Sequence, residues 1–150
     1  MLQLNLACYV LVLLDMIGGS GYDNITSDKE IFLRWLQANT FMPSLQFSFA
    51  IAISHTFVDL HATHTPYIME RFSLAVSNGE PVNPPMWYLG FGSVADEFLL
   101  GDRILAAPVQ RRGTFTFQLV SGKTGTIMKS GAWLHNYPAP LNILPYFMKH

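Results

Sequence analysis

An apolar run that ends in a carboxylate and a glycine turn is the feature that most constrains the fold. Tyr9–Leu14 is continuously apolar, and Asp15 is followed at once by Met16-Ile17-Gly18-Gly19. A run of this kind is typical of a strand that is covered on both faces, and the carboxyl end of such a strand presents functional groups in parallel β/α units. We therefore expect a buried strand over Tyr9–Leu14 that presents Asp15 at its end.

The composition describes a chain rich in core-forming residues and poor in charge. Half of its residues are apolar and 13% are charged, with a net charge of -1. This balance excludes a disordered chain and gives no general attraction to nucleic acid or to anionic lipid. It also predicts that apolar surface is covered by other parts of a larger protein, or that the chain self-associates through it.

The amino-terminal stretch has two possible structural interpretations. Leu2–Leu14 resembles the apolar core of a signal peptide, but it lacks a basic preceding region and an A-x-A cleavage site. It is also too short for a membrane span. A buried strand is the favoured interpretation and a signal or anchor the alternative. The single cysteine, Cys8, excludes an internal disulfide and is expected to be a buried thiol.

Two helices are predicted in the first part of the chain. Ser27-Asp28-Lys29-Glu30 forms a capping box at the start of the first, and Pro43 ends it. Its helical spacing turns Ile31, Phe32, Trp35, Leu36 and Asn39 inward and places Arg34 and Gln37 on the other face. The second helix runs from about 53 to 76, with a kink or break at Pro66 and a stop at Asn78-Gly79. The side chains of its inner stripe are Phe57, Leu60, His64, Ile68, Phe72 and Ala75.

Short strands dominate the rest. Met86–Leu89 reads as a strand entered through two prolines, and residues 96–100 as one turn of helix. Beyond residue 101 the chain changes character, because residues 114–120 alternate and Gly122, Gly125 and Gly131 mark turns, which predicts short strands. These strands cover residues 104–109, 114–120, 132–137 and 144–148. The fold class is therefore α/β, followed by an all-β part.

An ordered series of motifs resembles glycoside hydrolase family 31, and most closely the myogenesis-regulating glycosidase branch. The series covers roughly residues 10–110 well and 131–149 fairly, and its motifs follow the order and spacing of the family. It consists of Asp-Met-Ile-Gly-Gly (15–19), Arg-Trp-Leu-Gln (34–37), Phe-Met-Pro (41–43), Pro-Pro-Met-Trp (84–87), Phe-Leu-Leu-Gly-Asp (98–102) and Ala-Ala-Pro-Val (106–109).

The resemblance implies the last βα units of a TIM (β/α)8 barrel and part of a C-terminal β-sandwich. Residues 1–100 would form the barrel portion and residues 101–150 the partial sandwich, with Tyr9–Leu14 as the seventh barrel strand and Met86–Leu89 as the eighth. The implied activity is retaining hydrolysis of O-glycosyl bonds in α-glucosides or α-galactosides, as part of carbohydrate metabolism. The alternative is a non-catalytic interaction or carbohydrate-binding remnant.

The candidate site residues concern sugar binding. Retaining hydrolysis uses two carboxyl groups about 5–5.5 Å apart. In the family both lie on earlier strands, and the nucleophile motif W-x-D-M-N-E is absent here, so no catalytic residue is assigned and both are expected upstream of Met1. The chain alone is therefore expected to be inactive. The family places Asp15 at sugar hydroxyls, and Trp87 is assigned either to the core or to a sugar-stacking position at the pocket rim.

The sequence gives weaker evidence on the type of sugar, on metals and on the cellular compartment. Gly19 replaces an aromatic residue of many members, and residues 46–48 replace an Arg-Asn-His triplet, which leaves α-galactosides or another sugar open. His55, His61 and His64 lack the H-E-x-x-H pattern, so neither a metal nor a cofactor is expected. Membrane association of this chain is not expected. Proteins of the related branch are secretory or membrane-associated, and the sequence leaves the compartment open.

Overall fold

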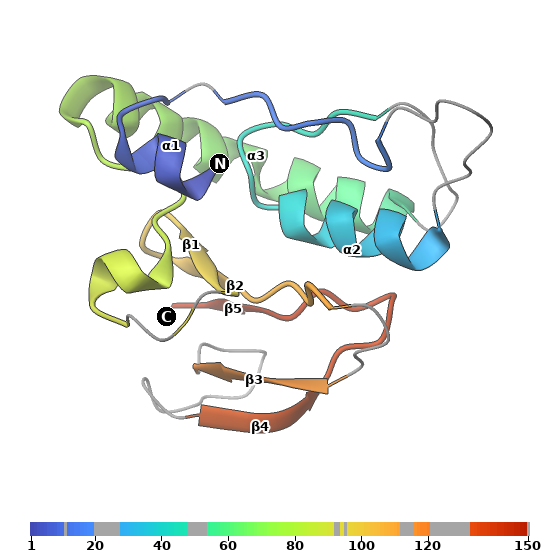
Figure 1. Ribbon diagram of the computed structural model, residues 1–150. Coiled ribbons are helices and arrows are strands. Elements are labelled where there is room, and N and C mark those ends of the chain that lie inside the picture. The colour runs from blue at the N-terminus through green and yellow to red at the C-terminus, as the bar shows by residue number, and fades with distance from the viewer. Residues whose placement is uncertain are drawn as a thin grey trace.

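The computed structural model describes residues 1–10, 12–19, 28–47, 54–91, 94, 96–111, 116–120 and 133–149. The three α-helices form an upper layer in Figure 1, with two small sheets stacked beneath them. The elements are α1 (Leu2–Leu6), α2 (Lys29–Asn39), α3 (His55–Asn78), the 3-10 helix η3 (Met86–Leu89), β1 (Phe98–Leu100), β2 (Ile104–Ala106), β3 (Thr116–Val120), β4 (Trp133–Pro138) and β5 (Tyr146–Met148). Among the helices so described, none has the length and apolar character needed to cross a membrane.

The all-β part confirms the strands expected beyond residue 101. The first sheet has the order β1-β2-β5, and both of its pairs are antiparallel. The second sheet pairs β3 with β4, and its register shifts between Phe117 and Leu119. Residues 96–100 were expected to form a helical turn. This expectation is wrong, because Phe98–Leu100 is strand β1 and pairs with β2.

Helix α2 begins one residue later than its capping pattern suggested. Asp28 is the N-cap, and its Oδ1 accepts a hydrogen bond from the backbone N–H of Glu30 at 2.8 Å. Ser27 lies outside the described residues. The inner face follows the expected spacing, since Phe32 and Leu36 are fully buried and Trp35 packs against the same core at its edge. Ile31 is instead exposed.

The other face of α2 contradicts the sequence interpretation. Arg34 and Gln37 were placed on the outer face, yet both are buried. The reason is tertiary, because the chain after β4 returns along α2 and its backbone carbonyls accept the hydrogen bonds of these two side chains. Helix α2 is therefore buried on two sides, which a single apolar stripe does not reveal.

Helix α3 continues without a break through Pro66. The carbonyl of Ala62, which Pro66 leaves without its helical N–H, lies at an exposed position and can be hydrated. The expected end is confirmed, because Gly79 caps the helix in the left-handed region at φ 78°. Phe57, Ile68 and Ala75 are buried as the inner stripe predicts.

The segment before the glycine turn is not a strand. Tyr9 and Leu13 are 62% and 69% exposed, and Cys8, expected as a buried thiol, is also exposed. One parallel contact is present, in which the N–H of Ile17 donates to the carbonyl of Gln46 at 2.8 Å and Ile17 pairs with Phe47. A strand is stabilised by neighbours on both edges. The part of the chain that the structure describes gives this segment one bridge on one side.

Met86–Leu89 was expected to be the eighth barrel strand, and this is also wrong. It forms η3, in which the N–H of Tyr88 donates to the carbonyl of Pro85 at 3.0 Å. Pro85 instead forms an antiparallel bridge with Phe98 at the edge of β1. The parallel partner of the first segment is therefore Phe47, on the chain between α2 and α3, and not the segment at Met86–Leu89.

Candidate functional site

Asp15 lies on the segment that leads into the Ile17–Phe47 bridge, two residues before Ile17. Its side chain is exposed, and its Oδ1 accepts a hydrogen bond from the N–H of Met16 at 2.8 Å. Gly18 and Gly19 follow with φ of 90° and 71°, a backbone conformation that glycine adopts readily. Within the described ranges the second carboxylate oxygen of Asp15 has no hydrogen-bond partner, so it is free to accept a bond from a ligand hydroxyl.

Trp87 lies on η3 in an aromatic surface group. Trp87 is 48% exposed, and Tyr88, Leu89 and Phe91 beside it are exposed as well. In this chain the Trp87 side chain is therefore not buried in the core. It presents an exposed indole face that a sugar ring or a protein surface could cover.

The structure does not bring the two sugar-binding candidates together. In Figure 1 the segment at 12–19 passes over the upper right of the molecule, while η3 lies at the lower left beside β1. Met86–Leu89 packs at the β1 edge instead of beside the Asp15 turn. Asp15 and Trp87 therefore do not line one site within this chain.

The histidines of α3 were considered as metal ligands in the sequence, and two of them contact neighbouring elements. No cluster of three potential ligands exists among the residues that the structure describes. His61 bonds through Nδ1 to the carbonyl of Thr40 at 2.8 Å. The ring of His64 lies 5.4 Å from that of Phe41 and 6.1 Å from that of Tyr146, between centroids. Both side chains therefore join α3 to neighbouring elements.

Acid should destabilise the protein through His64. Burial, and secondarily the charge of His61, hold the pKa of His64 below its ordinary value near 6.5. The unfolded chain has the ordinary pKa and the folded chain has the lowered one. Between them, the unfolded chain binds a proton that the folded chain does not. The free energy of unfolding should therefore fall as the pH drops below about 6.5. Urea unfolding at pH 7.5 and pH 5.5 measures this loss. The His64→Gln variant should show a smaller loss, and equal losses in both proteins would contradict the assignment.

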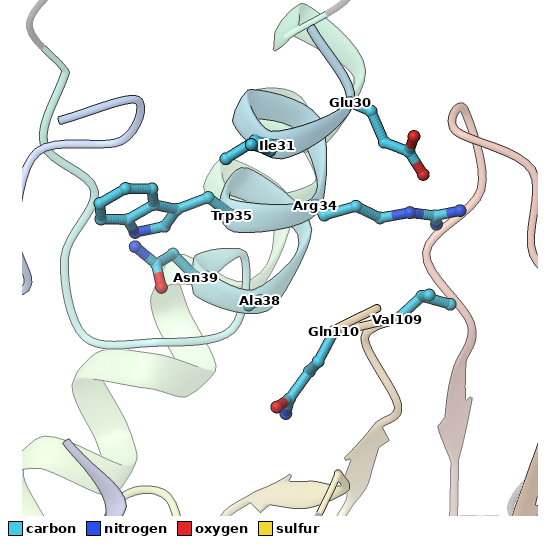
Figure 2. Close-up of a pocket in the computed structure, with 8 residues that line it drawn as sticks. All are labelled: Glu30, Ile31, Arg34, Trp35, Ala38, Asn39, Val109 and Gln110. Carbon is cyan, nitrogen blue, oxygen red and sulfur yellow. The ribbon is translucent and has the colours of Figure 1, made fainter. Parts of the chain in front are cut away.

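A pocket of about 480 Å³ opens between α2 and the chain that follows β2 (Figure 2). The wall on the α2 side consists of two rows of side chains. One row is formed by Glu30, Arg34 and Ala38, and the next by Ile31, Trp35 and Asn39. Val109 and Gln110 close it from the other side. The pocket includes neither Asp15 nor Trp87, so it is a separate feature of the molecule.

Arg34 is held in place at the wall of this pocket. Its Nη2 donates to the carbonyl of Ala139 at 2.8 Å and its Nη1 to Oε1 of Gln37 at 3.0 Å. The Nε2 of Gln37 donates to the carbonyls of Leu141 and Ile143 at 2.9 and 3.1 Å. Burial lowers the pKa of Arg34 and the nearby Glu30 carboxylate opposes this shift, so the guanidinium stays charged at neutral pH.

Sequence reasoning did not find this pocket. The motif Arg-Trp-Leu-Gln (34–37) was noticed only as part of a series, and its polar members were assigned to solvent. The sequence did contain one signal of a buried polar pair. The Arg34 guanidinium and the Gln37 amide are three residues apart, on a helix whose opposite face is apolar. Such a pair, one turn apart, can act as one hydrogen-bonding unit.

Comparison with known proteins finds curated relatives of this chain. No family model matches it. It is 30% identical to the myogenesis-regulating glycosidase of Mus musculus over 178 aligned residues, and 29% identical to the SITS-binding protein of Tetronarce californica. These alignments cover 97% and 99% of this chain, and 24% and 25% of the relatives. The chain thus spans about a quarter of the length of the curated relatives it matches.

Solved structures agree on the fold. A GH31 α-xylosidase from a soil metagenome, complexed with xylose, matches 99% of this chain and 29% of its own with a TM-score of 0.83 at 21% identity. The GH31 dextranase of Flavobacterium johnsoniae, solved as a mutant with isomaltotriose, matches 81% of this chain and 18% of its own with a TM-score of 0.69 at 25% identity. The structural relatives therefore bind sugars.

The fold of this chain is accordingly that of the last βα units of a (β/α)8 barrel, followed by part of a C-terminal β-sandwich. The strands expected at Tyr9–Leu14 and Met86–Leu89 are absent from the described structure, in which α1, α2 and α3 precede the two antiparallel sheets. The chain is thus similar to proteins of glycoside hydrolase family 31 and to the myogenesis-regulating glycosidase, and it corresponds to about a quarter of the latter's length.

Proposed function

We propose that this chain supplies a sugar-contacting and domain-joining part of a family 31 α-glycosidase, which as a whole hydrolyses O-glycosyl bonds of an α-glucoside or α-galactoside. One observation carries the proposal. The exposed Asp15 carboxylate stands beside a parallel bridge between two chain segments, in a motif that resembles the sugar-binding turn of the family. A carboxylate oxygen there can accept hydrogen bonds from sugar hydroxyls.

The two parts of the chain would have different roles. Residues 1–100 would belong to the barrel and carry Asp15, while residues 101–150 would begin the sandwich. The hydrogen bonds from Arg34 and Gln37 to the chain at 139–143 would fix these parts to each other. Trp87, which is exposed, would stack on a sugar or face a neighbouring part of the same larger protein.

Cleavage is not expected from this chain alone. Hydrolysis with retention needs an attacking carboxylate and a proton-donating carboxyl group about 5–5.5 Å apart. The sequence contains no W-x-D-M-N-E motif. Asp28 and Glu30 lie two residues apart, but Asp28 caps α2.

The test combines an activity assay with a binding assay on the whole chain. The purified protein should release no nitrophenol above background from nitrophenyl α-glucoside or α-galactoside. In ¹⁵N-labelled protein the amide signals of Gly18 and Gly19 should shift saturably with methyl α-glucoside or methyl α-galactoside. Asp15→Asn should weaken this binding by about tenfold, while Asp59→Asn on the exposed face of α3 should leave it unchanged. Unaltered binding in Asp15→Asn would reject the assigned role, and clear turnover would reject the lack of cleavage.

A second candidate is a non-catalytic interaction module. The observation that favours it is exposed apolar surface on the described chain, with Leu13 at one place and Trp87, Tyr88 and Phe91 at another. Surfaces of this kind promote self-association or bind a partner. Sedimentation of the chain distinguishes the cases, because concentration-dependent assembly that Leu13→Glu or Trp87→Glu abolishes would favour the interaction role.

A further inference from the structure

The pocket beside α2 has the size and the lining of a ligand site. Its volume of about 480 Å³ falls within the range of small-molecule pockets, roughly 300–1,000 Å³. Its walls combine an indole, a carboxylate, a guanidinium and two amides, from Trp35, Glu30, Arg34, Asn39 and Gln110. The function proposed above uses none of these groups for a ligand.

Asn39 provides the second observation. The residue is only 6% exposed, and its Nδ2 has no hydrogen-bond acceptor in the described structure. Trp35 lies four residues earlier on the same face of α2 and lines the same pocket. Buried donors are nearly always satisfied in folded proteins. A ligand oxygen in the pocket would satisfy the Asn39 amide.

The charges at the pocket select for a neutral ligand. Glu30 and Arg34 stand one turn apart on the same wall, as Figure 2 shows, and their charges are opposite. An anion would meet the Glu30 carboxylate and a cation would meet the Arg34 guanidinium. Arg34 cannot readily turn away, because it is bonded to the carbonyl of Ala139 and to Gln37.

Hydroxyl groups fit this mixture of donors and acceptors. Each hydroxyl can donate to the Glu30 carboxylate and accept from Asn39, Arg34 or Gln110. The indole of Trp35 supplies a flat apolar surface with a polar N–H at its edge. We propose that the pocket between α2 and Gln110 binds a neutral carbohydrate as a pyranose ring, at a site separate from the Asp15 turn.

The test follows two side chains of the pocket in the whole ¹⁵N-labelled chain. Maltose and methyl α-galactopyranoside are titrated, and the indole N–H signal of Trp35 and the side-chain amide signals of Asn39 are recorded. At least one sugar should shift both signals saturably. Ala38→Leu fills the pocket without removing a donor and should weaken binding at least about tenfold. Ala62→Leu, at an exposed position of α3, is its matched control and should bind as the unaltered protein does.

Asp15→Asn separates this site from the one proposed above, because it should leave the Trp35 and Asn39 shifts intact. If Ala38→Leu does not fold, Gln110→Ala at an exposed position should weaken binding at least threefold. The proposal is overturned if neither sugar shifts the two signals, or if inorganic phosphate or adenosine shifts them as strongly as the sugar. It is equally overturned if Asp15→Asn abolishes the shifts.

Discussion

Replacing Phe41 with alanine should lower the free energy of unfolding by about 3–5 kcal/mol. The side chain is fully buried. Its ring lies 5.1 Å from that of Tyr146 on β5 and 5.4 Å from that of His64 on α3, between centroids. Truncation therefore leaves a cavity where the end of α2, α3 and the first sheet meet. Urea unfolding followed by far-ultraviolet circular dichroism measures the loss.

The matched control for this prediction is Phe91→Ala. Phe91 is 43% exposed, so its truncation removes far less buried area and should cost less than about 1 kcal/mol. Because small domains have only about 5–15 kcal/mol of stability in total, the alanine variant at Phe41 can lose its fold. Phe41→Leu then provides a milder loss, of roughly 1–2 kcal/mol. Equal losses at Phe41 and Phe91 would contradict the role of Phe41 at this junction.

Replacing Gln37 with leucine should cost about 2–4 kcal/mol. The substitution keeps the approximate volume of a fully buried side chain but removes its amide. The carbonyls of Leu141 and Ile143 then lose their donor, and the Nη1 of Arg34 loses an acceptor. An unsatisfied buried polar group costs about 1–3 kcal/mol, and three groups are affected here.

The loss at Gln37 should also be local, and hydrogen exchange can detect this. Amide exchange should accelerate most over residues 139–143, because this segment is attached to α2 by these bonds. Gln110→Leu makes the same chemical change at an exposed position and should alter stability by less than about 0.5 kcal/mol. A Gln37→Leu protein with unchanged stability and unchanged exchange would show that the segment is held by packing alone.

The two substitutions probe different links of the same junction. Phe41 connects helices to the first sheet by apolar packing, whereas Gln37 and Arg34 connect α2 to the returning chain by hydrogen bonds. The second link also fixes the wall of the pocket that contains Arg34. Loosening it by Gln37→Leu should therefore weaken sugar binding at the pocket as well.

Local signals in the sequence determined α2, α3 and the strands beyond residue 101, whereas α1 and η3 formed where strands were expected. A capping carboxylate at Asp28, a proline at Pro43 and a glycine at Gly79 set the ends of α2 and α3, because each acts on the backbone within one turn. Alternation of apolar and polar residues marked β3, and β2, β4 and β5 were expected as short strands in the same part of the chain. The motif series identified the family, because order and spacing are properties of the sequence alone.

Tertiary structure alone decided the remaining features, because they depend on partners distant in the chain. Tyr9–Leu14 is apolar enough for a buried strand, but a strand needs edge partners, and one bridge to Phe47 does not provide them. Gln37 is polar, yet it is fully buried, because carbonyls more than a hundred residues away accept its hydrogen bonds. The sequence thus determined α2, α3, the strands beyond residue 101 and the resemblance to a family, and long-range contacts decided the elements at 9–14, 86–89 and 96–100, which faces are buried and where a pocket opens.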